Sequence, residues 1–297
     1  MNDRARVALP LAYAAICLIW GSTYLAIKVG LESFDPFFFA GVRYLTATAI
    51  MYAIARWRGV RFGGPLRRWL PAFAVGVMFI GVSNGCVFWA ETRLDSGFTA
   101  LLITASPLWT ALLTPLLAGE RRLRRVGWLG IMLGLAGTAV LLQPWRANRV
   151  ELAAALAVEV SVVVWVAGSL LVRRIRHDFD PLALTVAQMA AGTPVLLALA
   201  GVRGSALVGP VTPTAVLALA YLVVFGSCVA FAAYNHLLRH WEASRVATST
   251  YINPVVAVAL GALILGEPVT GTMVAGAAVV LAGVAIVLHE QRGPGRT

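Results

Sequence analysis

The stretch that decides the fold is residues 106–120, SPLWTALLTPLLAGE, because a related stretch returns 147 positions later at residues 253–267, NPVVAVALGALILGE. In both, a polar residue precedes a proline, an apolar run follows, and Gly-Glu closes the stretch. A pattern that returns at a fixed spacing is typical of a chain built from repeated units. The sequence therefore predicts two copies of one unit.

Two further matches keep nearly the same spacing. Trp20 and the tripeptide at 34–36 (Phe-Asp-Pro) align with Trp165 and the same tripeptide at 179–181, at an offset of 145. At the ends of the copies, Gly130 and Gly137 align with Gly276 and Gly283, at an offset of 146. We therefore divide the chain into a first repeat, residues 1–145, and a second repeat, residues 146–297.

The composition is that of an integral membrane protein. Of 297 residues, 60% are hydrophobic and 12% are charged, and the mean hydropathy is +0.82. A helix needs about 20 apolar residues to cross about 30 Å of hydrocarbon. The short loops leave no room for a soluble catalytic domain. The apolar stretches of the sequence predict an all-α protein with ten transmembrane helices, near 9–30, 36–55, 70–90, 96–118, 126–143, 151–172, 181–201, 214–237, 243–265 and 271–289.

The net charge of +11 is explained by topology and not by nucleic-acid binding. One set of alternate loops carries eighteen basic residues and the other set carries five, with Arg43 left inside a predicted span. Cytoplasmic loops are enriched in Lys and Arg. The pattern predicts a multi-pass protein of the bacterial inner membrane with both termini in the cytoplasm. The run after Arg4 and Arg6 continues to Val29, longer than a signal-peptide core, so we expect a retained first helix.

An odd number of spans in each copy has a geometric consequence. If each repeat holds five helices, the second repeat enters the membrane upside down relative to the first. Transporters built from inverted repeats bind substrate near the middle of the membrane and open alternately to each side. The sequence thus predicts two inverted five-helix repeats around a central cavity, working by alternating access.

Polar and aromatic side chains at the middle of spans are the candidate cavity residues. Trp20 and its counterpart Trp165 lie about halfway through their spans, where tryptophan is less common than at the interface. Hydroxyls in these spans also have a plain structural interpretation, since serine and threonine hydrogen-bond between membrane helices. The candidates are Trp20, Ser22, Thr23, Tyr24, Asn84, Ser161, Trp165 and Tyr221.

Two charged residues lie at matching depths inside predicted spans, Arg43 and Glu159. A charge at such depth costs about 3 kcal/mol on insertion scales, so a partner or a water-filled cavity is expected. We hypothesise that both face the cavity, either as an ion pair or as a site for a substrate carboxylate (Arg43) and for proton coupling (Glu159). The alternative is that each is satisfied locally.

Pro107 and Pro254 are predicted to kink the fourth and ninth spans and to act in gating, because a proline inside a helix removes a hydrogen bond and clashes with the preceding turn. The freed carbonyls lie near Ile103 and Thr250. Ser106, Trp109, Tyr251 and Asn253 are therefore expected beside the substrate. Glu120 and Glu267, which follow glycine at the helix ends, are expected to cap the next helix.

Other features favour packing over chemistry. Cys17, Cys86 and Cys228 have no metal-ligand spacing, and no acid or thiol accompanies His236 and His240. We expect no metal, no cofactor and no catalytic residues, because the catalytic motifs of intramembrane enzymes are absent from the spans.

Together, Trp-Gly-Ser-Thr at 20–23, the mid-helix prolines and the two Gly-Glu ends resemble the EamA branch of the drug/metabolite transporter superfamily, over essentially the whole chain. The resemblance implies a permease with the fifth and tenth helices peripheral, and the family exports amino acids, often aromatic ones, other metabolites or drugs. Its motif residues fall here on Trp20, Ser22, Pro107, Glu120, Pro254 and Glu267. The second copy departs at residues 166–168, Val-Ala-Gly. Smaller four-helix relatives use an acid in their first helix, which this span lacks.

The sequence therefore predicts an exporter of small amphipathic metabolites, most of all aromatic or other apolar amino acids. The alternative is a multidrug exporter of cationic compounds, whose ligands would contact the same aromatics through cation–π interactions. The expected partners are the small-molecule substrate and membrane lipid, in a monomer or weak oligomer.

Overall fold

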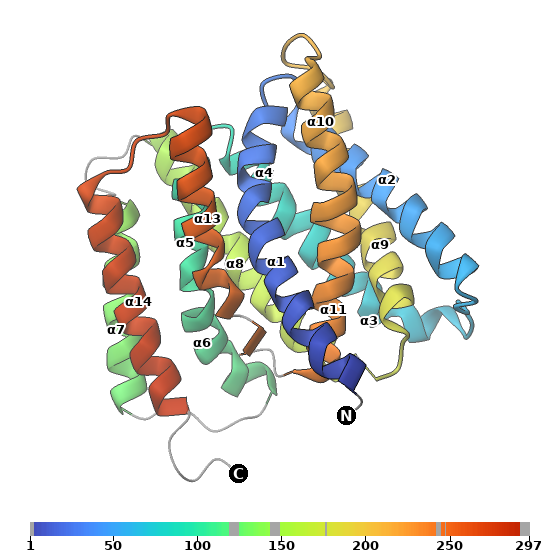
Figure 1. Ribbon diagram of the computed structural model, residues 1–297, viewed down its shortest axis with the longest axis horizontal. Coiled ribbons are helices and arrows are strands. Elements are labelled where there is room, and N and C mark those ends of the chain that lie inside the picture. Colours follow the sequence, from blue (N-terminus) through green and yellow to red (C-terminus); the bar gives the residue numbers. More distant parts are fainter. Residues whose placement is uncertain are drawn as a thin grey trace.

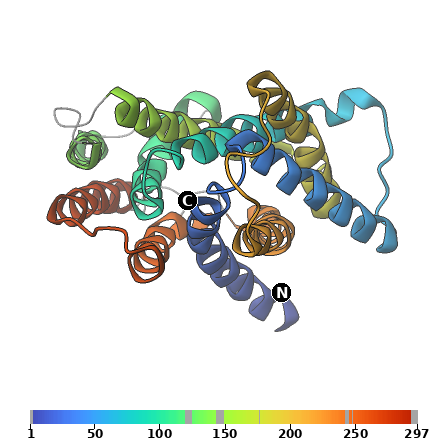
Figure 2. The ribbon, with the colours of Figure 1, turned by 90° about the horizontal axis from the view of Figure 1, so that it is seen from above.

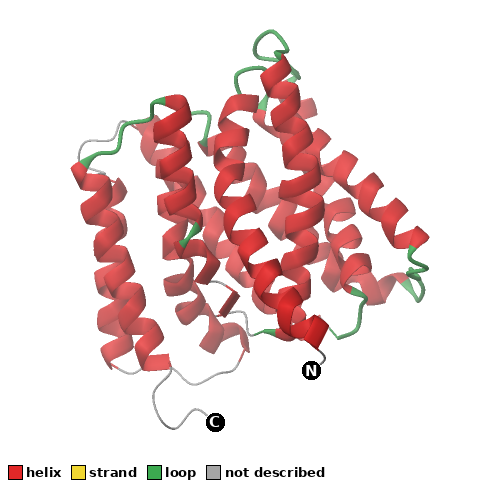
Figure 3. Ribbon diagram, in the orientation of Figure 1, coloured by secondary structure: helices red, strands yellow, loops and turns green. Residues whose placement is uncertain are grey.

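The computed structural model describes residues 3–118, 125–142, 149–175, 177–241, 245–246 and 248–291. All regular elements in these ranges are helices, and the single β contact is an isolated bridge between Phe34 and Leu207 (Figure 3). The helices are α1 (Asp3–Gly30), α2 (Pro36–Trp57), α3 (Leu66–Gly76), η1 (Val77–Asn84), α4 (Gly85–Ala90), α5 (Ser96–Leu102), η2 (Ile103–Ala105), α6 (Ser106–Ala118), α7 (Arg125–Leu142), α8 (Arg149–Ile175), α9 (Pro181–Arg203), α10 (Pro213–Tyr221), η3 (Leu222–Val229), α11 (Ala230–His240), η4 (Thr248–Tyr251), α13 (Asn253–Leu260), η5 (Gly261–Leu265) and α14 (Gly271–Gln291).

The prediction of an all-helical membrane protein is confirmed. Eight continuous helical stretches of the described chain are long and apolar enough to cross a membrane, and α7 and α14 contain the shorter apolar stretches Arg125–Leu141 and Gly271–Val287. Several spans are composite, such as Leu66–Ala90, which joins α3, η1 and α4. That the ten helices form two inverted repeats stays a prediction.

The helices form one bundle with a peripheral pair (Figure 1). α7 and α14 pack against each other at one edge, and α2, α3 and α9 lie at the opposite edge (Figures 1 and 2). The start of α1 and the end of α14 lie at the same end of the bundle. We call this end, where α2 ends at Trp57 and α3 begins at Leu66, the arginine-rich end, and the other the arginine-poor end.

The repeated Phe-Asp-Pro tripeptide is a helix start. Asp35 Oδ1 accepts hydrogen bonds from the backbone N–H groups of Phe37 (3.0 Å) and Phe38 (3.3 Å), and Pro36 is the first residue of α2. Asp180 caps α9 in the same way, with Pro181 as its first residue. An N-cap carboxylate satisfies free N–H groups, and proline costs nothing at the first helical position.

The loops that carry this tripeptide also join the two repeats. At the arginine-poor end, Arg203 Nε donates to Asp35 Oδ2 (2.7 Å), and Val208 N donates to Ser33 O (3.0 Å). At the arginine-rich end, Arg68 donates to the Asp178 carbonyl and lies 5.2 Å over the Phe179 ring. Each repeat therefore contacts the other through the loop between its first two spans, once at each end of the bundle.

Two π-helical segments occupy equivalent positions in the repeats. η1 and η3 are each eight residues long, and each begins and ends 145 positions from the other. π-Helical turns are rare and often occur at functional sites. Nothing in the residue pattern predicts them, since they interrupt spans that read as continuous apolar helices.

The helices around the two prolines are also interrupted. A 3₁₀ turn, η2, precedes Ser106 and Pro107, and a second, η4, precedes Asn253 and Pro254. The Ile103 carbonyl, which a proline at 107 leaves without its usual N–H donor, accepts a hydrogen bond from Ser106 Oγ (2.7 Å). A role of these prolines in gating stays a prediction.

Candidate functional site

An aromatic cluster fills the middle of the bundle between the repeats. Trp20 of α1 and Trp165 of α8 meet edge to face, with ring centroids 5.5 Å apart. Phe79 of η1 stacks on Trp165 at 4.2 Å, and Phe231 and Tyr234 of α11 lie 5.7 and 5.0 Å from Trp20. Aromatic pairs in these geometries attract each other beyond their area burial. The two tryptophans thus face the protein interior and touch.

Three candidate residues converge on Gly226 of η3. Trp20 Nε1 donates to the Gly226 carbonyl at 3.3 Å. A Cβ atom at Gly226 would lie 2.9 Å from Thr23 Cγ2 and 3.0 Å from Arg43 Nη2. Because only glycine leaves this space open, α1, α2 and η3 approach each other closely here.

Arg43 lies at the centre of this convergence, in α2. Its side chain is only 2% exposed, and Nε donates to Ser227 Oγ at 2.8 Å. The guanidinium lies 4.7 Å from the Tyr44 ring centroid and 5.7 Å from that of Phe88. Its two terminal nitrogens have no hydrogen-bond partner among the described residues. A guanidinium presents a planar fork of donors that fits a carboxylate.

Glu159 has a different partner, and the hypothesis of an Arg43–Glu159 ion pair is wrong for this conformation. Trp109 Nε1 of α6 donates to Glu159 Oε2 at 2.9 Å, and the other carboxylate oxygen has no partner in the described part of the chain. The two residues lie at equal depth in the membrane, but α2 and α8 present them to different neighbours. The pairs that form are Arg43 with Ser227 and Glu159 with Trp109.

The hydroxyl candidates are held by hydrogen bonds within and between helices. Ser22 Oγ and Tyr221 OH are 2.5 Å apart, which joins α1 to α10. Ser161 Oγ lies 3.0 Å from Ser83 Oγ of η1, and Thr23 Oγ1 donates back to the Trp20 carbonyl. The structural interpretation therefore accounts for these contacts, and any substrate contact would have to replace them.

Asn84 is joined to the Arg43 region through Tyr44. Tyr44 OH donates to Asn84 Oδ1 (2.8 Å), and Asn84 Nδ2 donates to the Phe79 carbonyl inside the π-helical turn. Asn84 therefore connects the Arg43 neighbourhood to the aromatic cluster. Tyr24 is buried on α1, towards the arginine-poor end of the bundle.

Near the second proline, Asn253 holds the interrupted helix against α1. In the amide orientation that satisfies its neighbours, Nδ2 donates to Ser249 O (3.1 Å) and to Cys17 O (2.9 Å). Tyr251 packs against the apolar cluster formed mainly by α5, α6, α7, α8 and α14. The predicted neighbours of the prolines are therefore divided between two regions instead of lining one wall.

Glu267 is a capping residue, but the helix it caps is not the next one along the chain. Its carboxylate accepts from Ser96 N (2.8 Å), Ser96 Oγ (2.8 Å) and Gly97 N (3.0 Å), at the start of α5 in the first repeat. The prediction that it caps α14 is wrong because η5 ends beside α5, which the sequence spacing does not reveal. Its counterpart Glu120 lies outside the described residues.

Replacing Glu267 with alanine is expected to lower the free energy of unfolding by about 2 kcal/mol, since the start of α5 loses a charged cap and three hydrogen bonds. Thermal unfolding of the purified protein measures this. Glu32→Ala, which removes an exposed carboxylate at the same end, is the control and should leave the melting temperature unchanged. Equal melting temperatures for both variants would contradict a capping role.

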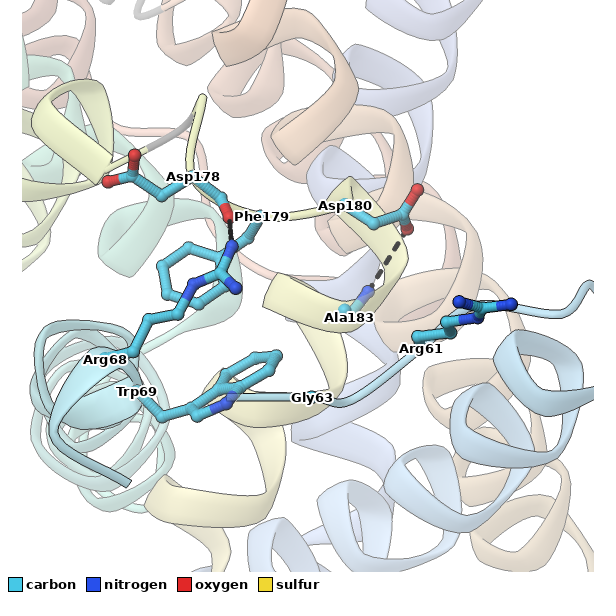
Figure 4. A pocket seen from close by; sticks show the side chains of 8 residues that line it. All are labelled: Arg61, Gly63, Arg68, Trp69, Asp178, Phe179, Asp180 and Ala183. Carbon is cyan, nitrogen blue, oxygen red and sulfur yellow. Dashed lines mark hydrogen bonds between the residues drawn. The ribbon is translucent and has the colours of Figure 1, made fainter. Parts of the chain in front are cut away.

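A cavity of about 160 Å³ lies at the arginine-rich end, away from the aromatic cluster (Figure 4). It is lined by Arg61, Gly63, Arg68, Trp69, Asp178, Phe179, Asp180 and Ala183. Arg68 and Asp180 already bind backbone groups of the protein there, so the cavity accompanies the contact between the repeats. At the middle of the bundle, aromatic side chains occupy the position where we predict a central cavity.

Several residues of this region are not among the site residues that the sequence predicts. Tyr44 and Phe79 read as ordinary apolar positions, and Gly226 reads as a packing glycine. Ser227, Phe231 and Tyr234 stand out in the sequence only as polar or aromatic residues of one span. The repeat gives an indication of this region, because Gly226 and η3 lie 145 positions after Gly81 and η1.

The comparisons with known proteins agree with this architecture. The EamA-like transporter family matches residues 9–143 and 152–289. An uncharacterised inner membrane transporter, YedA of Escherichia coli K12, is 34% identical over 274 residues, covering 89% of this chain and 86% of that protein. A probable amino-acid metabolite efflux pump of Salmonella typhimurium is 26% identical, with 91% of each chain covered.

A solved crystal structure has the same fold, with a TM-score of 0.69 at 22% identity over 96% of this chain and 99% of the other. The family match extends over both halves of the chain, which confirms the resemblance seen in the sequence motifs. Together with the membrane spans, it identifies the protein as a multi-pass membrane transporter. The chain belongs to the EamA-like transporter family.

Proposed function

We propose that the protein exports small carboxylate-bearing metabolites, most of all aromatic or other apolar amino acids, across a bacterial inner membrane by alternating access. The observation that carries the proposal is Arg43, a buried guanidinium whose terminal nitrogens have no protein partner in the described chain. A buried positive charge is costly unless it is paired. A substrate carboxylate would supply the missing partner.

The surroundings of Arg43 suggest the rest of the substrate. Trp20 contacts the same glycine, Gly226, and belongs to the aromatic cluster with Trp165 and Phe231. An aromatic or aliphatic side chain of a bound amino acid would replace contacts within this cluster. The name of the Salmonella relative, an amino-acid metabolite efflux pump, supports this class, and that of YedA supports the inner membrane.

Alternating access rests on the predicted inverted repeat. Reciprocal loop contacts at opposite ends of the bundle support it, since a twofold axis in the membrane plane would place equivalent contacts at opposite ends. Opening either end would require the repeats to part at the loop contact of that end.

Glu159 favours a second candidate, export of cationic compounds. One of its carboxylate oxygens has no partner in the described part of the chain, and the Trp165 side chain lies on the same helix. A carboxylate beside aromatic faces attracts organic cations. Arg43 argues against this candidate, because it places a positive charge in the same bundle core.

Reconstitution in liposomes distinguishes the two candidates. Purified protein is tested for flux of labelled phenylalanine, tryptophan, leucine, sugars and a quaternary amine, with protein-free liposomes as the control. We expect saturable flux of amino acids, inhibited by the corresponding free carboxylates and not by the amino alcohols. Flux restricted to the quaternary amine would instead establish the cationic candidate.

A further inference from the structure

Glu91 is a buried acid that the transport site does not use. It follows α4 at the arginine-poor end, and its side chain is 0% exposed. Neither carboxyl oxygen has a hydrogen-bond partner among the described residues. The other acids nearby are held differently: Glu267 caps α5, and Asp35 pairs with Arg203. Unlike these two acids, Glu91 is fully buried and has no hydrogen-bond partner in the described part of the chain.

The cations around Glu91 are bonded to other groups. Lys28 Nζ of α1 donates to the backbone carbonyls of Glu91 (3.0 Å) and Leu94 (2.7 Å), and not to the carboxyl group. Arg43 Nε of α2 donates to Ser227. Both cations are near enough to act on Glu91 electrostatically, and so is the negative charge of Glu267, which opposes them. The cations thus attract the carboxyl group without solvating it.

The remaining neighbours in the described part of the chain add no hydrogen-bond partner for Glu91. Tyr24 of α1 interacts with Glu91 electrostatically, and Asp95 interacts with Glu267 and Lys28 in the same cluster. α8 packs along α4, but its Glu159 is bonded to Trp109 and its Glu151 is exposed. The η1 segment, which also packs on α4, carries no charged residue. An ionised Glu91 would therefore be dehydrated with no hydrogen bond in return.

We propose that Glu91 is a proton-binding site, occupied while the arginine-poor end is closed as in this structure and emptied when that end opens to water. A neutral carboxyl group loses far less hydration on burial than a carboxylate. When the end opens, water would reach the carboxyl group and Lys28 could stabilise the carboxylate. One proton would then leave Glu91 for the surrounding water.

Linkage gives the sign of the pH effect. Burial raises the pKa of the Glu91 carboxyl well above its usual range, against the opposing effect of Lys28. The closed arrangement binds the proton more tightly than the open or unfolded one. Glu91 therefore stabilises the closed arrangement most at pH values near or below the ordinary pKa of a glutamate. This contribution is lost as the pH rises through the raised pKa of Glu91.

Infrared spectra of the full-length protein in lipid, compared between the wild type and its variants, test the proposal without any transported compound. The outcome is therefore independent of the proposed function. We expect the stretching band of a protonated carboxyl group at neutral pH in the wild type and in Glu32→Gln, an exposed acid at the same end. The band should be lost in Glu91→Gln, in which an amide replaces the neutral acid at nearly the same size. A band of unchanged intensity in Glu91→Gln, or none in the wild type, would overturn the proposal.

The pH dependence of thermal unfolding, measured for the wild type and both variants, is a second readout. The wild type should lose several degrees of melting temperature as the pH is raised from acidic to alkaline values. Glu32→Gln should follow it, whereas Glu91→Gln should lose markedly less. Parallel curves for the wild type and Glu91→Gln would overturn the proposal, because Glu91 would then hold no extra proton in the folded protein.

Discussion

Arg43→Gln is expected to abolish most transport of a carboxylate-bearing substrate while leaving the protein folded. Removing one partner of a buried, hydrogen-bonded charge pair costs about 2 to 5 kcal/mol. At 1.4 kcal/mol per tenfold change, this is a loss of roughly 30-fold to several-thousand-fold in apparent affinity or rate. The loss follows because glutamine keeps a polar contact with Ser227 but offers no charged fork to the substrate.

The measurement is initial flux into liposomes, with the amino acid and its amino alcohol compared in each variant. Arg93→Gln is the matched control, since Arg93 is an exposed arginine at the arginine-poor end. Arg43→Lys should retain part of the activity, because lysine supplies the charge but not the bidentate geometry. If Arg43→Gln transports the amino acid at the rate of Arg93→Gln, Arg43 does not bind the carboxylate.

Gly192→Ala should be strongly destabilising, although it adds a single methyl group. A Cβ atom at this position of α9 would lie 2.4 Å from the Gly76 carbonyl oxygen and 2.3 Å from Ile80 Cβ. Small residues let membrane helices approach this closely, and here the facing backbone belongs to the end of α3 and to the middle of η1. Overpacking of a rigid contact costs about 1 to 3 kcal/mol, and a clash with backbone places the expected cost at the upper end.

Gly201→Ala, in the same helix, is the control. Nothing lies within 4 Å of a Cβ atom there, so the higher helix propensity of alanine should be neutral or stabilising by up to about 1 kcal/mol. Melting temperature and the fraction of monodisperse protein after extraction from the membrane measure both variants. Similar values for Gly192→Ala and Gly201→Ala would show that α9 and α3 can separate at no cost.

Some site features follow from residue patterns and others do not. A charged residue at mid-depth in an apolar span needs a partner, so the sequence alone indicates Arg43 and Glu159 as candidate site residues. Their partners could not, because Ser227 lies 184 positions from Arg43 and Trp109 lies 50 positions from Glu159. Matching depth constrains only one dimension, and the rotation of each helix about its axis decides which neighbour it meets.

Glu267 illustrates the same limit. Its position after glycine at a helix end indicates a capping carboxylate, and it is one. Which helix it caps depends on how α5 and η5 are placed side by side. Glu267 does not cap the nearest helix along the chain, because the bundle brings the start of α5 within 3.0 Å of this carboxylate.

The sequence by itself determined the membrane class, the helical spans, the repeat spacing and the family, because hydropathy and recurring motifs are properties of the chain in order. Tertiary structure alone decided the pairs: Trp20 with Trp165, Arg43 with Ser227, Glu267 with the start of α5, and the π-helical turns that η1 and η3 introduce. It also left Glu91 buried without a hydrogen-bond partner among the residues that the structure describes. Each residue pair depends on helix rotation and on contact between residues more than 140 positions apart. The burial of Glu91 depends on how the helices pack around it. Local sequence encodes neither.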